Sequence, residues 1–123
     1  MGKAAPDATI DSMLDYIDQC TVMHVCSAEP ANYAGIAAVS LADVTLTADT
    51  DFTKANGDVS GRKVTVAAKS GVTVDTSGTA THVAIARVAD TTLRYVTTCT
   101  SQVLTAGNTV NIPAWDIEVA DPT

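Results

Sequence analysis

Apolar and polar residues alternate along most of this chain. Where the alternation has a period of two, Val, Ile and Thr supply most of the residues, and these β-branched side chains pack well on a pleated sheet. Turn-forming residues separate the alternating segments. The pattern therefore predicts six strands, over residues 21–27, 39–47, 62–68, 81–88, 93–99 and 109–119.

One segment near the N-terminus has a helical period instead. Ile10, Met13, Leu14 and Ile17 are spaced i, i+3, i+4 and i+7, which places them in one apolar stripe on a helix. The spacing predicts a helix over 7–20 that packs its stripe against the core. β-Branched residues follow and favour a change to strand.

Turn residues set the connections between these segments. We expect loops at Asn32–Gly35 and at Asp49–Ser60, where Asn56-Gly57-Asp58 is a good turn sequence. Ser70-Gly71 is expected to end the strand that precedes it. Ala89–Thr92 has the length of an ordinary hairpin loop and joins the two segments with the clearest alternation.

Two interruptions of the alternation predict irregular strands. The alternation slips by one residue at Ala42-Asp43, which indicates a bulge or bend. Pro113 interrupts the last alternating segment, and proline cannot donate a ladder hydrogen bond. That segment is therefore expected at a sheet edge or in a strand that passes between sheets.

The chain length and the short strands together define the fold class. A chain of 123 residues fits one domain, 1–123, with a core of its own. Many short strands separated by frequent turns favour a sandwich. We expect a mainly β protein: a single antiparallel β-sandwich or jelly-roll-like domain with one N-terminal α-helix.

Charge and hydropathy restrict the partners. Seven Lys and Arg against fourteen Asp and Glu give a net charge of −7, and Arg62-Lys63 is the only adjacent basic pair. Nucleic-acid binding needs clustered basic residues, so no nucleic-acid partner is expected. No stretch approaches the ~20 apolar residues of a membrane span, and the first residues lack an apolar signal segment. We expect a chain made in the cytoplasm, with no membrane partner.

The three cysteines, Cys20, Cys26 and Cys99, leave several interpretations open. Their spacing does not match a zinc site. Cytoplasmic cysteines are usually reduced and buried. Two of the three could instead pair within the chain, or one could form a disulfide with a neighbouring subunit, because an odd count permits an intermolecular bond.

Candidate catalytic and metal-binding residues are few. His24 and His82 lie within predicted strands, and no nucleophile motif accompanies either of them. The carboxylates Asp43, Asp49, Asp51 and Asp58 form a loose group without the spacing of a calcium loop, so a solvated loop is the default interpretation. The sequence predicts neither an enzyme nor a protein with a metal or cofactor.

The order of several short motifs resembles a family of small phage virion proteins described as tail-fibre-like or head-decoration-like. The closest resemblance is to those of phages and prophages of alphaproteobacteria. It covers most of the chain, although its motifs largely encode strands and turns. The matching segments are Met13–Ile17 (MLDYI), His24–Pro30 (HVCSAEP), Thr81–Ile85 (THVAI), Leu93–Val96 (LRYV) and Ala106–Ala114 (AGNTVNIPA).

The resemblance implies a non-enzymatic virion structural protein. Such a protein decorates or links particle components at the capsid surface, collar or neck, and its partners are other virion proteins and copies of itself. It is assembled in the host cytoplasm. The cysteines are not a feature of that family, and an intersubunit disulfide through Cys20, Cys26 or Cys99 would be a linkage particular to this chain. The alternative is a tail-tip or fibre module that recognises a host surface or glycan, for which Tyr33 and Phe52 are the candidate loop aromatics.

Overall fold

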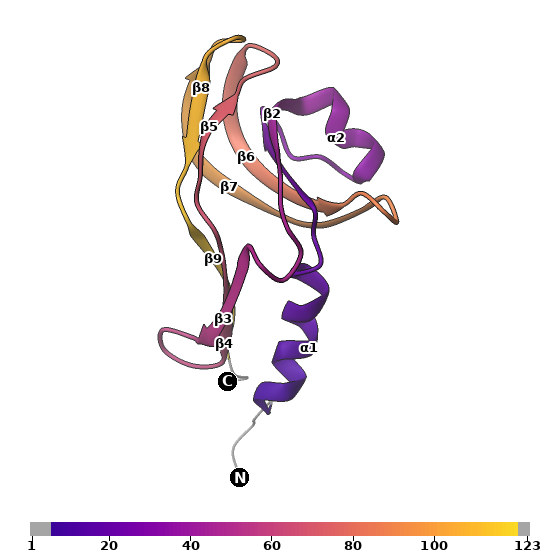
Figure 1. Cartoon of the computed structure of the whole chain (residues 1–123), viewed down its shortest axis with the longest axis vertical. Helices are drawn as coiled ribbons and strands as arrows, with labels where there is room; N and C mark the ends of the chain where they lie inside the picture. The colour runs from indigo at the N-terminus through magenta and orange to yellow at the C-terminus, as the bar shows by residue number, and fades with distance from the viewer. Residues whose placement is uncertain (1–5, 121–123) are drawn as a thin grey trace.

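A computed structural model, which describes residues 6–120, shows a mainly β protein with antiparallel sheets and an N-terminal helix (Figure 1). One layer is a curved sheet with a short helix on its outer side, and the other layer is formed by two smaller sheets. The elements are α1 (Asp7–Ile17), β1 (Val22–Cys26), α2 (Tyr33–Val39), β2 (Ser40–Thr45), β3 (Phe52–Asn56), β4 (Arg62–Val66), β5 (Lys69–Thr73), β6 (Gly78–Arg87), β7 (Thr92–Leu104), β8 (Thr109–Ile112) and β9 (Trp115–Val119).

The first layer is a four-stranded sheet in the order β2-β1-β6-β7, with every pair antiparallel. Its two central strands are covered on both faces, and their sequences are correspondingly apolar along their length. In β6, four consecutive residues, from Val83 to Ala86, are all buried. Alternation is lost here because a strand buried on both faces needs apolar residues at successive positions.

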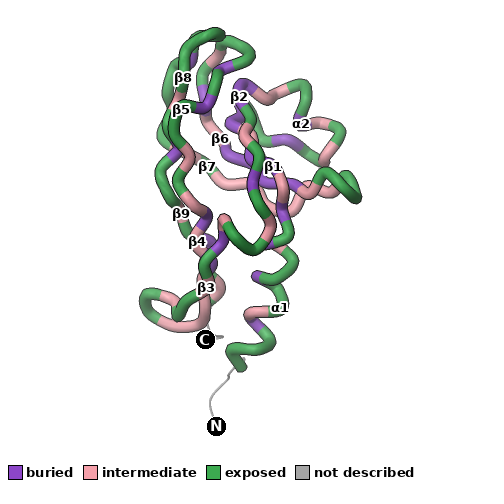
Figure 2. Tube along the Cα trace, in the orientation of Figure 1, coloured by how far each residue is buried: buried purple, intermediate pink, exposed green. Residues whose placement is uncertain are grey.

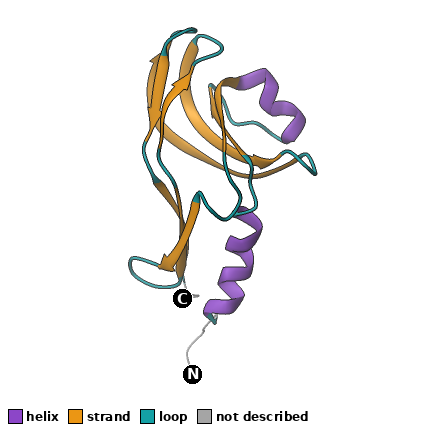
Figure 3. Cartoon of the chain, in the orientation of Figure 1, coloured by secondary structure: helices purple, strands orange, loops and turns teal. Residues whose placement is uncertain are grey.

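The second layer consists of the sheets β3-β4-β9 and β5-β8. The strand pairs β4–β9 and β5–β8 follow each other and form one bent ribbon (Figure 3). Val66 pairs with Trp115 below the bend, and Lys69 pairs with Ile112 above it. These two pairs have the same register, so the ladder resumes in step after the interruption. Pro113 has no N–H to contribute there, and the N–H of Ala67 turns away to donate to Asp51 O at 2.8 Å.

The main core lies between the two layers, and α1 closes it at one end (Figure 2). Ile10 and Leu14 of α1 are almost fully buried in this core. A smaller apolar cluster lies on the other face of the four-stranded sheet, where Ile36 of α2 packs against Val22 and Ala86. Small side chains on β6 allow α2 to approach the sheet closely.

Much of the expected architecture is confirmed. The expected hairpin is the antiparallel pair β6–β7, and its turn lies at Val88–Thr91. The expected break at Pro113 is a passage between sheets, since β8 and β9 belong to different ones. The bulge is present, although its extra residue is Leu41: Val25 pairs with Ala42, and Cys26 pairs with Ser40.

Five local predictions differ from the structure. Asn32–Gly35 is not simply a loop, because Asn32 Oδ1 accepts a hydrogen bond from Gly35 N at 2.8 Å and caps α2. The first helix ends at Ile17 rather than at residue 20, with Asp18 as its C-cap. Asp49–Ser60 contains the strand β3, and Ser70-Gly71 lies inside β5 rather than at a strand end. The segment 109–119 is two strands.

Candidate functional site

The three cysteines are all free thiols, and they differ in solvent exposure. Cys20 and Cys26 are fully buried, whereas Cys99 on β7 is partly exposed. Burial raises the pKa of Cys20 to about 12 and the pKa of Cys26 to about 11. Thiolates are the reactive form of cysteine, so both buried groups are poorly reactive at neutral pH. Among the three cysteines, Cys99 alone is exposed enough to contact a neighbouring molecule.

The histidines form local hydrogen bonds. His24 Nδ1 lies 2.9 Å from Ser40 Oγ on the neighbouring strand, a contact that sequence reasoning missed. Burial lowers the pKa of His24, and the nearby charge of Asp43 opposes this shift only in part. The imidazole is therefore neutral at pH 7 and able to accept the Ser40 proton. His82 Nδ1 contacts the hydroxyl of its neighbour Thr81 at 2.8 Å.

The His24–Ser40 pair resembles the first two members of a catalytic triad, but its surroundings are structural. Asp43 pairs with His24 across the β1–β2 ladder, and no hydrogen bond between their side chains is found in residues 6–120. Ser40 is also the residue next to the Leu41 bulge. The pair therefore stabilises the irregular part of this ladder, and neither residue lines the hollows described below.

The loose group of carboxylates is not assembled into one site. Asp43 interacts with Asp75, and this hydrogen bond raises the pKa of Asp75. Asp49 lies against Asp18, Asp51 binds Lys69 Nζ at 3.1 Å, and Asp58 binds Lys63 Nζ at 2.8 Å. Within residues 6–120, no three His, Cys, Asp or Glu side chains are grouped so as to hold a metal ion.

The basic side chains between residues 6 and 120 all bind groups of the protein itself. Most of them join elements distant in sequence: Arg62 binds Asp11 of α1 at 2.9 Å, and Lys54 binds Asp15 of the same helix. Arg87 donates to the carbonyl oxygen of Gln19 at 3.1 Å. These contacts fix α1 to the strands. No helix in this part of the chain is long and apolar enough to span a membrane.

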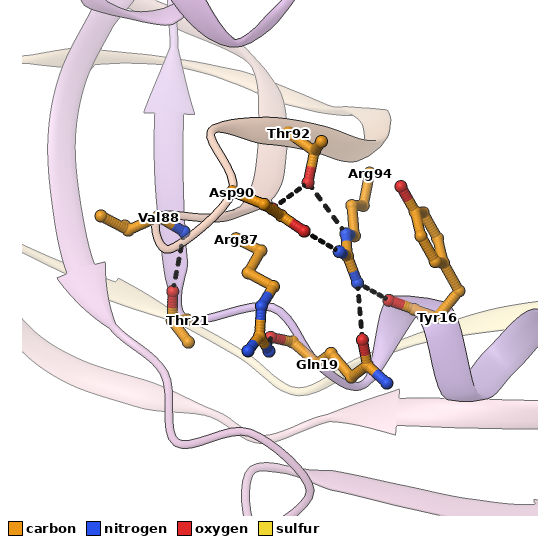
Figure 4. A network of polar contacts seen from close by, with 8 residues as sticks. All are labelled: Tyr16, Gln19, Thr21, Arg87, Val88, Asp90, Thr92 and Arg94. Atoms are coloured by element: carbon orange, nitrogen blue, oxygen red, sulfur yellow. Dashed lines mark hydrogen bonds and ion pairs between the residues drawn. The ribbon is translucent and has the colours of Figure 1, made fainter.

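Arg94 is the centre of the most extensive polar network (Figure 4). Its side chain is 3% exposed and binds the carboxylate of Asp90 at 2.7 Å. It also donates to the carbonyl oxygen of Tyr16 at 2.7 Å and to Gln19 Oε1 at 3.1 Å. The guanidinium lies 3.7 Å from the centroid of the Tyr16 ring. This network ties the end of α1 to the β6–β7 hairpin, so its role is structural.

Of the two expected loop aromatics, one is buried and the other is partly buried. Phe52 is buried in β3 at 7% exposure, and Tyr33 packs on the small cluster beneath α2. Tyr95 and Trp115 instead stack on each other, with ring centroids 6.1 Å apart. Trp115 also lines a depression, which we call the seam groove.

The seam groove runs between β7 and the β8–β9 segment and consists of two adjoining hollows. The first has a volume of about 280 Å³ and the second about 220 Å³, and both open to solvent on one side. Both are lined by Val83, Cys99, Ile112 and Pro113. Apolar residues such as Val25, Ala80 and Leu104 line the rest of the first hollow.

An uncharged stretch of sequence forms most of both sides of this groove, and Asp116 is the one charged residue that lines its two hollows. From Tyr95 to Trp115 there is no Asp, Glu, Lys, Arg or His, although charged residues are 17% of the chain. The stretch is visible in the sequence and was the one available signal for the groove. It could not be interpreted without knowing that β7 and β8 face each other.

Trp115 lines the second hollow and also carries a buried polar group that lacks a partner in the described part of the chain. Its indole Nε1 is buried, and it has no hydrogen-bond partner among residues 6–120. A buried donor without an acceptor is costly, by about 1–3 kcal/mol, and is uncommon in folded proteins. Comparison of the chain with family models, with curated proteins and with solved structures found no match, so its function has to be argued from this geometry.

Proposed function

We propose that this chain is a non-enzymatic structural protein of a phage particle, which decorates or links components at the capsid surface, collar or neck. The observation that carries the proposal is the use of its charged residues. Each Lys and Arg between residues 6 and 120 binds the protein's own carboxylates or carbonyl oxygens, and these bonds join α1, the hairpin and the small sheets. Polar chemistry in this part of the chain serves to hold the fold together.

The resemblance to small virion proteins supports the same role. A compact β domain with excess negative charge can be repeated by symmetry on a particle without binding nucleic acid. A disulfide between subunits, if the particle uses one, would involve Cys99, because Cys20 and Cys26 are buried. Host-surface recognition is less well supported, since Phe52 is buried and Tyr33, the first residue of α2, is partly buried against the small cluster.

Mass spectrometry of purified particles tests the proposal. The chain should be present in many copies per particle, and omission of reductant should show whether it is linked through Cys99. Its absence from particles, or its presence only in trace amounts, would exclude a structural role. Binding of the isolated chain to host cells would favour the recognition module instead.

A further inference from the structure

β7 leaves one side of its main chain unpaired. It is an edge strand of 13 residues, and β6 is its only ladder partner. Apart from that ladder, no main-chain to main-chain hydrogen bond in residues 6–120 involves Thr92–Leu104. An edge strand of this kind can pair with an added strand through its outward N–H and C=O groups.

The opposite edge of the sandwich is more fully covered. β2 is linked to the second layer through the bridge between Ala42 and Val74, and Leu41 O accepts hydrogen bonds from the N–H groups of Asp75 and Thr76. The two layers are therefore joined by main-chain bonds on the β2 side. On the β7 side they are separated by the seam groove.

The groove has places for side chains as well as for a backbone. A strand laid along β7 would direct alternate side chains to the same face, about 7 Å apart along the strand. The two adjoining hollows are largely apolar and can receive such side chains.

Charge restricts what can enter. No charged residue lines the first hollow, and a charged side chain placed there would lose water and find no partner of opposite charge. Asp116 lines the second hollow, but its carboxylate already binds Thr65 Oγ1 at 2.6 Å and Lys63 Nζ at 3.5 Å. The occupant should therefore be uncharged where it contacts the groove.

A second copy of β7 is a poor occupant, because two irregularities interrupt this strand. Ala80 pairs with Gln102 but His82 pairs with Thr98, so Cys99 to Ser101 form a bulge. A second irregularity lies at Arg94, between the pairs Ile85–Tyr95 and Ala86–Leu93. Bulges on an edge strand oppose flat pairing of two identical edges. A short separate segment can form its ladder with Tyr95–Thr98 and continue past the bulge, beside the first hollow, without ladder bonds.

We infer that the seam groove binds an extended, uncharged segment of a partner protein, which adds as a strand along β7 and places alternate apolar side chains in the two hollows. This inference goes beyond the particle role and does not depend on it. Failure to find the chain in particles would leave the groove unaffected, and failure of peptide binding would leave the particle role unaffected.

The experiment is a titration of the purified chain with end-blocked peptides in which Thr alternates with Val, Leu, Ile or Phe. Trp115 is the only tryptophan and lies in the groove, so its fluorescence reports binding directly. Cys99 lines both hollows, so peptide should also slow its reaction with a thiol reagent. We expect at least one peptide of the set to bind with a Kd below about 1 mM and to produce both signals.

Two peptide controls test how the segment binds. Methylating alternate backbone nitrogens of the best peptide removes its ladder donors and should weaken binding by about tenfold. Replacing its apolar residues with Asp should abolish binding. Equal affinity of the methylated peptide would contradict strand addition, and a set in which no peptide changes either signal would contradict the whole inference.

Protein variants test where the segment binds. Cys99→Tyr fills the shared part of both hollows and should abolish the fluorescence change, and Thr100→Tyr is a milder variant at the exposed wall of the first hollow. Val59→Tyr is the matched control, because Val59 is 97% exposed and does not line the groove. If the chain alone sediments as a dimer with Cys99 protected, a second copy occupies the groove and the inference is wrong.

Discussion

The guanidinium of Arg94 is stacked on the ring of Tyr16, and the same group binds the carbonyl oxygen of Tyr16. The Arg94 side chain thus contacts both the aromatic ring and the main chain of Tyr16, in the last turn of α1. A cation at the C-terminal end of a helix is also favoured by the helix dipole. The position of α1 therefore depends strongly on a residue of β7.

Replacing Arg94 should be among the most destabilising changes outside the apolar core. Arg94→Ala removes bonds to Tyr16 O, Gln19 and Asp90, and we expect a loss of about 2–4 kcal/mol in the free energy of unfolding. Arg87→Ala, which removes one exposed bond to Gln19 O, is the control and should cost about 1 kcal/mol or less. Urea titration measures both. Equal losses would show that the stacked position has no special importance.

Asp18 and Asp49 should make stability depend on pH. Burial and the nearby charge of Asp49 raise the pKa of Asp18 to about 6, above its value of 3.8 in an unfolded chain. The folded state therefore binds the proton more tightly. The stabilisation is fully present below pH 3.8 and is lost as pH rises through 6, by about 3 kcal/mol.

Asp49→Asn tests this pair directly. It removes the repulsion, and Asn tolerates the positive φ of 64° at this position. The variant should be more stable than the original chain at pH 7, and the change near pH 6 should become smaller. Thermal unfolding from pH 4 to pH 8 measures both effects. An unchanged pH profile would mean that Asp49 does not control the proton on Asp18.

The β6–β7 turn contains a strained residue that can be relieved. Thr91 has a φ of 50°, an unfavourable conformation for a β-branched side chain. Thr91→Gly should stabilise the protein by about 1 kcal/mol, and Thr91→Val, which keeps the branching, should not. Differential scanning calorimetry can rank the three proteins. A loss of stability in the glycine variant would show that the Thr91 side chain makes a contact important for the turn.

Two glycines with nearly the same backbone conformation should respond differently to alanine. Gly61 has a φ of 71° and Gly71 a φ of 66°. A Cβ atom on Gly61 would lie 1.9 Å from Val119 O, whereas a Cβ on Gly71 would meet nothing within 4 Å. Gly71→Ala should therefore cost about 1 kcal/mol for backbone strain, and Gly61→Ala distinctly more. Denaturant unfolding of the two variants measures the difference.

Period-two patterns located strands well where one face is exposed, as in β4, in which only the alternate residues Val64 and Val66 are buried. They failed in two kinds of place. β3 has the polar sequence FTKAN and is held by its ladder with β4, which only the fold supplies. α2 has seven residues, too few to show a helical period, and its Asn32 cap was the one local signal.

The candidate site depends on tertiary structure more than the strands do. Cys99 was identified from the sequence, but its exposure relative to Cys20 and Cys26 follows from the covering of each strand. The seam groove combines β7 with β8, and Pro113 was recognised only as a break. Its place at the wall of both hollows depends on how the ribbon bends.

That bend has a consequence for how the protein opens. Because β4–β9 and β5–β8 are one ribbon interrupted for two residues, neither small sheet has an independent boundary at which unfolding could stop. The ribbon should therefore exchange its amide hydrogens as one cooperative unit, with Val64 and Val72 released together although they belong to different sheets. The crease at Pro113 thus changes the direction of the chain without dividing the protein into separately melting parts.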